Sequence, residues 1–390
     1  MVRIVIDDFE HIAGANCQLS SLRKVLAHHE IELLEPMILG LCSGLGFFYF
    51  YMKRMPFPMT LGLAVKNTKV FERVLNRLGG SVKVTEITSV AIAHKNLVNL
   101  LEKREPATTF VDFAYLPFFF AEGTPIPNKS AGHFGGYTFV IYGIDEEKDE
   151  VYLSDRYARP FIMSYKLLQQ ARNSKHAPFP VKNKLVELVI PKKINNLKDI
   201  IPLVIKSNID FMFNPPIRNL GLKGLQKWRE MLPTCGKDFS IDDLLFGLMT
   251  NFIYFETGGT GGAMFRILYR DFLKEATELL NNGGLLKASE LFEKVIKKIR
   301  ELESILLPDD LVNFAKLRNL CLKSGEITET AANNYQKELK KIDSEFQITI
   351  DDGQKEAPKW KDFIPKMDKK IQEWADLEES AWKIIKKAVS

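Results

Sequence analysis

The pattern of hydrophobic and polar positions changes about half-way along the chain. In the first 190 residues, short β-branched and aromatic runs alternate with amphipathic stretches, which predicts a domain that mixes strands and helices. From Ile194 onward the strand pattern fades and apolar residues recur at helical spacing. We therefore expect an α+β domain over residues 1–192 and an all-α domain over residues 193–390.

The same pattern predicts the individual elements. In the first domain we expect helices where apolar residues follow one helix face, at residues 17–29, 70–78 and 90–103. Runs typical of strands follow, at residues 108–115, 137–142, 151–154 and 185–190, with a polar turn at 145–149. In the second domain helices are expected at residues 201–205, 222–231 and 241–255.

One stretch imitates a membrane span. Residues 37–52 read MILGLCSGLGFFYFYM, which is 16 residues with three glycines. A bilayer needs about 20 apolar residues, so we expect a buried helix and turn, with membrane insertion as the alternative. The first nine residues contain one arginine and two aspartates, whereas a signal peptide would continue with an apolar run. We therefore expect no signal peptide and a cytoplasmic protein.

Composition narrows the function classes. The apolar content of 46% is enough to bury a core, and the net charge of +5 lacks the clustered basic residues of a nucleic-acid-binding protein. Residues 281–390 hold 20 basic and 20 acidic side chains, which indicates solvated helix faces. The four cysteines are scattered and form no CxxC pair, so we expect neither disulfides nor a metal site.

Cys17 is the candidate nucleophile. It follows Gly14-Ala15-Asn16 at the start of the first expected helix, where Asn16 would act as N-cap. Free backbone N–H groups and the helix dipole favour a thiolate there, and the thiolate is the reactive form. The alternative is a small buried residue, which is how we interpret Cys42, Cys235 and Cys321.

A nucleophilic cysteine needs a base and a group that orients it. His133 lies in the segment SAGHFGG just before the strand at 137–142, and Asp155 follows the next strand, so a hairpin would bring the two together. His11 precedes Cys17 by six residues and could direct a donor at an oxyanion beside the sulfur. Each histidine could instead be structural.

The order of a helix-borne cysteine and a later hairpin histidine is typical of papain-like enzymes. Residues 11–50 contain HIAGANCQLSSLRKVL followed by LLEPMILGLCSGLGFFYF, and they resemble the N-terminal domain of the butirosin-biosynthesis acyltransferase family. Residues 133–156 resemble that family's histidine and aspartate hairpin. Residues 258–273, GGTGGAMFRILYRDFL, resemble the signature of its helical C-terminal domain.

The resemblance implies a papain-like fold of the bacteriocin-processing-peptidase type and a role in antibiotic or other natural-product biosynthesis. It implies that Cys17 accepts an acyl group from a carrier-protein thioester and passes it to an amine, with Asp155 orienting the base and His11 on the oxyanion side. The family's histidine stands six residues before the glycine that ends the strand, and here that position is Tyr137. Three interpretations stay open: His133 replaces the base, which we favour; Tyr137 hydrogen-bonds the thiol; or the site only binds.

Further residues are candidates for binding. Asn16 stands where the family often has a histidine. Gly259 and Gly261, with Arg266 and Arg270 nearby, could cradle the phosphate of a phosphopantetheine arm, although glycines before a helix more often make a tight turn. Four aromatic residues could line an acyl pocket or belong to the core: Phe47, Tyr49, Phe118 and Phe119.

We therefore predict a cytoplasmic, amide-forming, cysteine-dependent acyltransferase. It would bind no cofactor of its own, since the donor arm is the phosphopantetheine of an acyl carrier protein and the acceptor is a small-molecule amine. Neither nucleic acid nor membrane is expected as a partner, and a homodimer is left open. The rivals are a cysteine peptidase or amidase on the same fold, and an inactive papain-like binding protein.

Overall fold

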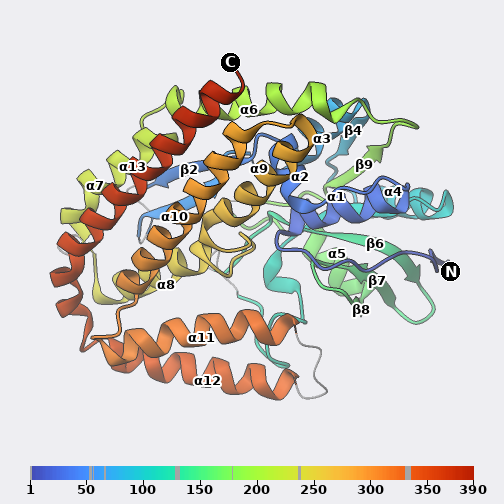
Figure 1. Cartoon of the computed structure of the whole chain (residues 1–390). Helices are drawn as coiled ribbons and strands as arrows, with labels where there is room; N and C mark the ends of the chain where they lie inside the picture. The colour runs from blue at the N-terminus through green and yellow to red at the C-terminus, as the bar shows by residue number, and fades with distance from the viewer. Residues whose placement is uncertain are drawn as a thin grey trace. The chain divides into compact units, whose positions relative to one another are not determined.

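The computed structural model describes residues 2–51, 55, 57–65, 67–127, 132–177, 179–235, 239–329 and 335–390 (Figure 1). The chain forms two compact units, which are described separately below. Unit 1 comprises Met1–Ile38 and Lys66–Asn196, and unit 2 comprises Leu39–Val65 and Leu197–Ser390. The segment Leu39–Val65 of unit 2 therefore lies, in the sequence, between the two segments that form unit 1.

Unit 1 is built on an antiparallel seven-stranded sheet. Its order is β4-β9-β5-β6-β7-β8, and β1 pairs with the far end of β6. The strands are β1 (Arg3–Val5), β4 (Ser81–Thr85), β5 (Ala107–Val111), β6 (Tyr137–Asp145), β7 (Glu150–Ser154), β8 (Pro160–Ser164) and β9 (Leu185–Val189). All nine residues of β6 are buried, so this strand forms the centre of the core.

Helices pack on this sheet. They are α1 (Cys17–His28), α3 (Lys69–Leu78), α4 (Val90–Glu102) and α5 (Tyr165–Arg172), with a short 3-10 turn η1 (Phe113–Tyr115) after β5. Helix α1 packs on β6, and its buried face includes Leu19, Leu22 and Leu26. This packing fixes the first residue of α1 next to the strand that begins at Tyr137.

Unit 2 is helical apart from one hairpin. Its helices are α6 (Leu197–Phe213), α7 (Gly221–Cys235), α8 (Ile241–Phe255), α9 (Arg266–Leu280), α10 (Gly283–Leu306), α11 (Val312–Glu329), α12 (Tyr335–Gly353) and α13 (Ile364–Ala388), with 3-10 turns η2 (Ala263–Phe265) and η3 (Ala357–Phe363). Helices α10 and α13 run side by side, and α11 pairs with α12 (Figure 1). Helix α2 (Glu35–Leu41) leads from unit 1 into the hairpin of β2 (Leu45–Phe50) and β3 (Met59–Leu63).

The predicted helices of both domains are confirmed, as are the predicted strands of the first, except that the strand expected at 108–115 ends at Val111 and gives way to the 3-10 turn η1. The prediction for residues 37–52 is only half right, because α2 ends at Leu41 and the aromatic run that follows is strand β2. The single boundary at residue 192 also differs from the structure, since the division falls after Asn196 and the β2–β3 hairpin belongs to unit 2. The reason is burial: β2 and β3 pack on helices α7 and α8.

The fold class is a mixed α and β unit with a helical second unit, as the sequence predicts. The second unit is not all-α, because it includes the β2–β3 hairpin. The papain-like assignment stays a prediction. In the described ranges, no helix has both the length and the apolar content needed to cross a bilayer.

Candidate active site

Cys17 is the first residue of α1, as the sequence predicts. The side-chain oxygen of Asn16 accepts hydrogen bonds from the backbone N–H groups of Gln18, at 3.0 Å, and Leu19, at 3.1 Å. Asn16 is therefore the helix cap, which satisfies two N–H groups that the helix itself leaves without partners. Its position is explained by this capping role, and binding of a substrate by Asn16 stays a prediction.

The loop before Cys17 is held from two sides. The backbone N–H of Ala15 donates to Glu35 Oε2 at 2.6 Å, and the N–H of Gly14 donates to the carbonyl of Arg156 at 2.8 Å. A Cβ atom at Gly14 would lie 2.5 Å from Glu35 Oε1, so this close approach requires glycine. The sulfur is thus fixed relative to both α2 and the segment after β7.

The environment of the Cys17 thiol keeps it protonated. Burial of the sulfur raises its pKa, and the negative charge of Asp155 adds to the effect. A hydrogen bond from the Thr138 backbone and the charge of Arg156 lower the pKa by less. The expectation of a thiolate at the helix start is therefore wrong for the resting site, because desolvation outweighs the helix N-terminus. The residue as a whole stays partly exposed.

Tyr137 and Asp155 form a buried pair. The Tyr137 hydroxyl lies 2.9 Å from Asp155 Oδ1 and 2.8 Å from Oδ2, and it donates its proton to this carboxylate. The antiparallel pairing of Val140 with Ser154 brings both residues to the same end of β6 and β7. Tyr137 therefore occupies the place relative to the carboxylate that the resemblance assigns to the histidine.

Burial dominates the titration of both members of the pair. It raises the pKa of the Asp155 carboxyl, although Arg156 and the hydrogen bonds from Arg156 and Tyr137 oppose this. It also holds the pKa of the Tyr137 hydroxyl well above its ordinary value, and the charges of Asp155 and Cys17 add to the increase. Tyr137 is therefore neutral at any physiological pH and cannot be the final acceptor of a proton.

The structure does not bring His133 to Cys17. Its Nδ1 lies 2.6 Å from Asp112 Oδ2 and its Nε2 lies 2.8 Å from the carbonyl of Pro127. The ring also stacks on His176 with a centroid distance of 3.6 Å. Both ring nitrogens are occupied by oxygen acceptors, which corrects the favoured expectation that His133 acts as the base. The upstream residues 128–131 lie outside the described part of the chain.

His11 lies beside the end of β7. Its Nδ1 is 2.9 Å from the hydroxyl of Ser154, and its ring packs edge-on against Tyr142 at 5.1 Å. Burial and the charge of Lys24 lower the pKa of His11, which favours the neutral imidazole. These contacts place His11 next to the residue that precedes Asp155, and its role on the oxyanion side stays a prediction.

Two buried charged residues were missed by the sequence reasoning. Lys24 is 1% exposed, and its Nζ donates to Ser20 Oγ at 2.6 Å and to the backbone carbonyl of Asp155. Burial lowers the pKa of Lys24 to about 8, against the opposing charges of Asp155 and Glu35. Burial raises the pKa of Glu35, which is 4% exposed. The spacing of seven residues between Cys17 and Lys24 puts both on one face of α1 and could have revealed the lysine.

Aromatic side chains surround Tyr137 in unit 1. The ring of Phe113 lies 5.3 Å and that of Phe119 lies 5.6 Å from the Tyr137 ring. Phe118 is buried and packs on Phe161 at 4.4 Å. Of the two phenylalanines predicted for an acyl pocket here, Phe119 is the one in contact with the Tyr137 ring.

The other two aromatic candidates belong to the core of unit 2. Phe47 stacks on Trp228 at 5.9 Å and meets the edge of Trp374 at 5.5 Å. Tyr49 is 2% exposed and lies in the same cluster. The expectation that Phe47 and Tyr49 line an acyl pocket is therefore replaced by the core interpretation, because strand β2 buries both rings among the helices.

The glycine loop at 258–262 makes a tight turn. Gly259 and Gly261 have φ values of +77° and +67°, and the Thr260 hydroxyl donates to the carbonyl of Phe255 at 3.0 Å. The Glu256 carboxylate accepts the backbone N–H of Ala263 at 3.1 Å. A carboxylate on this N–H group opposes a second anion, so the tight-turn alternative is favoured over the phosphate cradle.

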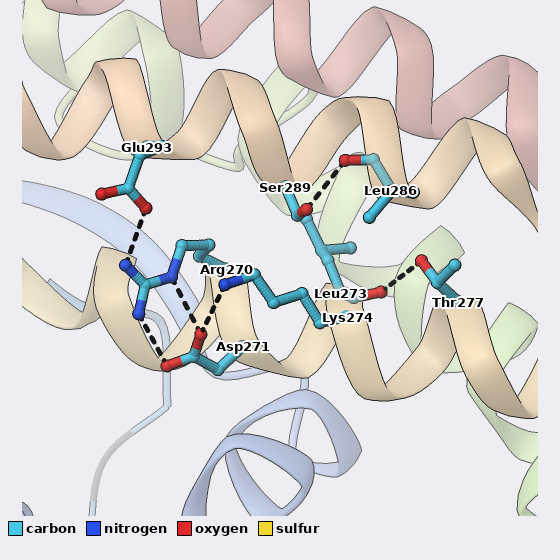
Figure 2. Close-up of polar contacts among 8 residues, drawn as sticks. All are labelled: Arg270, Asp271, Leu273, Lys274, Thr277, Leu286, Ser289 and Glu293. Carbon is cyan, nitrogen blue, oxygen red and sulfur yellow. Dashed lines mark hydrogen bonds and ion pairs between the residues drawn. The ribbon is translucent and has the colours of Figure 1, made fainter.

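The nearby arginines are also engaged. Arg266 is fully buried and forms a two-point ion pair with Glu378, at 3.2 and 2.9 Å. Arg270 lies between Asp271 and Glu293, as Figure 2 shows, with distances of 2.8, 2.9 and 2.7 Å. The expectation that Arg266 binds the phosphate of a carrier is therefore not supported, because its guanidinium already has a buried carboxylate partner. Across the described ranges, no group of three histidine, cysteine or acidic side chains could hold a metal ion.

Two family models match consecutive parts of the chain. Residues 16–156 match the model described as Butirosin biosynthesis protein H, N-terminal. Residues 166–307 match a Domain of unknown function (DUF4872), which runs from α5 to the end of α10. No curated protein matches the chain. The first match starts at Asn16, the cap of the Cys17 helix, and ends at Arg156, so it contains Cys17, Tyr137 and Asp155 together. Over residues 16–156 the chain is therefore similar to the N-terminal domain of butirosin biosynthesis protein H.

Proposed function

We propose that this protein is a biosynthetic acyltransferase that uses Cys17 as its nucleophile. The family of residues 16–156 points to acyl transfer in biosynthesis. The observation that carries the proposal for this chain is the placement of Cys17 at the capped start of α1, beside the buried pair of Tyr137 and Asp155. A partly exposed cysteine held in this way is suited to attack the carbonyl carbon of a substrate.

The reaction has two steps. The Cys17 sulfur attacks the carbonyl carbon of a carrier-bound thioester, the carbon–sulfur bond to the phosphopantetheine arm breaks, and the Cys17 proton ends on the departing thiol. An amine then attacks the carbonyl carbon of the acyl-enzyme, the amide bond forms as the carbon–sulfur bond to Cys17 breaks, and the Cys17 sulfur regains a proton from the nitrogen. The backbone N–H of Cys17 would stabilise the oxyanion in both steps, since the N–H groups of Gln18 and Leu19 already donate to the Asn16 cap.

A thioester donor suits this site better than a peptide. The leaving thiol has a low pKa and departs with little protonation, whereas a leaving amine must receive a proton. His133 is not free to supply that proton, since both of its ring nitrogens already have partners. This difference favours acyl transfer over the peptidase or amidase alternative. A carrier protein as donor and a small amine as acceptor follow from the same proposal.

The proposal is tested by mixing the full chain with an acyl-pantetheine thioester and measuring the mass of the peptide that contains Cys17. We expect the mass of one acyl group to be added at Cys17 and to be lost when an amine is supplied. The matched controls are Cys17→Ser, which removes the nucleophile, and Cys42→Ser, which changes a buried cysteine of unit 2. A folded protein with no adduct at Cys17 would sink the proposal.

The protonated thiol favours a second candidate, a binding protein that has lost turnover. Burial raises the pKa of Cys17, and a tyrosine takes the place of the base. If this candidate is right, acyl-pantetheine binds with equal affinity to the parent chain and to Cys17→Ser, measured by calorimetry, and neither protein forms an adduct.

A further inference from the structure

We infer that Tyr137 and Asp155 together replace the missing histidine, with Asp155 as the proton acceptor and Tyr137 as the relay between it and Cys17. The inference rests on the proposed function in one respect, namely that Cys17 is the nucleophile. It assigns a role to each member of the pair: the carboxylate is the base, and the phenol hydroxyl passes the proton on without becoming charged.

The direction of the Tyr137 hydrogen bond carries the inference. A tyrosine has one hydroxyl proton. The distances of 2.9 and 2.8 Å from the hydroxyl to the two carboxylate oxygens show that Tyr137 donates this proton in a hydrogen bond to Asp155. The lone pairs of the tyrosine oxygen are then left to accept a proton from another donor. Among the described contacts, no histidine donates a hydrogen bond to the Tyr137 oxygen.

Cys17 is the donor that we assign to this oxygen. Helix α1 packs on β6, and Cys17 borders the buried cluster that contains Tyr137. The backbone of Thr138, the next residue of β6, hydrogen-bonds the sulfur, and the charge of Cys17 raises the pKa of the Tyr137 hydroxyl. These relations place the thiol at the start of β6, the strand that also carries the hydroxyl that donates to Asp155.

Charge balance explains why a relay is needed. Five charged groups act on one another here: Asp155 and Glu35 carry negative charge, while Lys24, Arg156 and Arg23 carry positive charge. Burial still makes a free thiolate costly, because the sulfur loses its hydration. Transfer of the Cys17 proton to Asp155 leaves the total unchanged, because one negative charge disappears as another forms.

The step is balanced as follows. The S–H bond of Cys17 breaks and its proton joins the Tyr137 oxygen, while the original O–H bond of Tyr137 breaks and that proton joins an oxygen of Asp155. The sulfur electron pair forms the bond to the substrate carbonyl. When the carrier thiol leaves, the proton returns from Asp155 through Tyr137 to that sulfur. No oxidant, metal or other co-reactant takes part.

The titratable neighbours of Asp155 set the pH at which the relay works. Helix α1 contributes Cys17 and Lys24, strand β6 contributes Tyr137, the segment after β7 contributes Arg156 and Tyr157, and His11 and Glu35 face Lys24. Burial makes Asp155 a stronger base than an ordinary aspartate, which brings its proton affinity closer to that of the thiol.

Alkylation of Cys17 by iodoacetamide tests the relay without any acyl substrate. The rate is measured against pH from the mass of the Cys17 peptide in the full chain. We expect the parent rate to rise as Asp155 loses its proton and then to level off well below the pKa of the thiol. Tyr137→Phe keeps the ring but removes the hydroxyl, and should lower the rate near neutral pH by about 10²-fold, a typical loss for a general base.

Three further variants make the test specific. Tyr137→His restores an imidazole beside Asp155 and should recover most of the rate. Asp155→Asn should match Tyr137→Phe, and the double variant should be no slower than either, because the two residues act in one path. Tyr152→Phe is the matched control, since it removes a 2.9 Å bond between a tyrosine and Glu150 on β7.

The outcomes separate this inference from the proposed function. A Tyr137→Phe variant that keeps the parent rate and the parent pH profile overturns the relay, even if Cys17 is acylated. If the relay pattern appears but no thioester acylates Cys17, the relay stands and the proposed acyl transfer falls. A Tyr137→His variant slower than Tyr137→Phe also overturns the relay, because it would show that Asp155 does not accept protons through this position.

Discussion

Replacement of Lys24 by methionine separates the stability of unit 1 from its chemistry. The lysine is 1% exposed, and its Nζ donates to Ser20 and to the carbonyl of Asp155. Methionine has a similar length and no charge, so it fills the same space. The change removes both the buried charge and the two hydrogen bonds. Loss of the charge stabilises the folded state, whereas loss of the hydrogen bonds destabilises it.

The magnitude follows from the pKa of Lys24, which burial lowers from 10.5 to about 8. Near neutral pH the charged lysine therefore costs the folded state about 3 kcal/mol. The unmet carbonyl and hydroxyl cost about 1–3 kcal/mol in the variant. We expect the free energy of unfolding of Lys24→Met near neutral pH to lie within about 2 kcal/mol of the parent.

The pH dependence is the sharper result. Between pH values of about 8 and 10.5 the unfolded chain keeps a proton on Lys24 that the folded chain has released, so raising the pH stabilises the parent. From neutral pH to about pH 9.5 the parent should gain about 2 kcal/mol relative to Lys24→Met. The gain is absent below the folded pKa and complete above the unfolded one.

Pulse proteolysis in urea measures this difference at the two pH values. All four tryptophans lie in unit 2, at positions 228, 360, 374 and 382, so their fluorescence does not report on unit 1. Proteolytic fragments from β6 and β7 report on the unfolding of unit 1. Lys95→Met, at an exposed position of α4, is the control, because its charge already lies in water. A difference between parent and Lys24→Met that stays the same at both pH values would refute the reasoning.

Three further changes test other parts of the structure. Glu378→Ala leaves Arg266 as an unpaired buried charge and should lower the stability of unit 2 by about 3–5 kcal/mol, followed by tryptophan fluorescence in urea; adding Arg266→Leu should recover part of the loss. Gly14→Ala places a Cβ 2.5 Å from Glu35 Oε1 and should slow alkylation of the adjacent cysteine, with an unchanged rate as the contrary result. Asn16→Ala removes the cap of α1 and should cost about 1 kcal/mol by pulse proteolysis; no loss would contradict the capping role.

Most of the fold could be predicted because local pattern and burial agree. Strand β6 is mostly apolar and is buried along its whole length, so its sequence leaves little choice. Strand β2 was missed because a short apolar run fits a buried helix and a buried strand equally well. Its place in unit 2 depends on contacts with α7, which is more than 150 residues away in the chain.

The candidate site could be predicted only where a local rule applies. The cap at Asn16 and the cysteine that follows it form such a rule, and the structure confirms both positions. His133 was misplaced because the choice between histidine and tyrosine depends on which side chain meets Asp155 across the sheet. The neighbours of His133, Asp112 and the Pro127 carbonyl, come from other segments, and no spacing in the sequence reveals them.

Lys24 and Glu35 show why buried charges escape such reasoning and why they matter here. A lysine between apolar residues of a helix is normally drawn out to solvent, and only the presence of two carboxylates and a buried carbonyl makes its burial tolerable. One of those carboxylates, Asp155, acts together with burial to raise the pKa of the Cys17 thiol. The site therefore holds a neutral thiol, and a mechanism that suits it must meet one condition, which is to move the proton without adding a buried charge. A buried carboxylate reached through a tyrosine meets this condition, and a free thiolate does not.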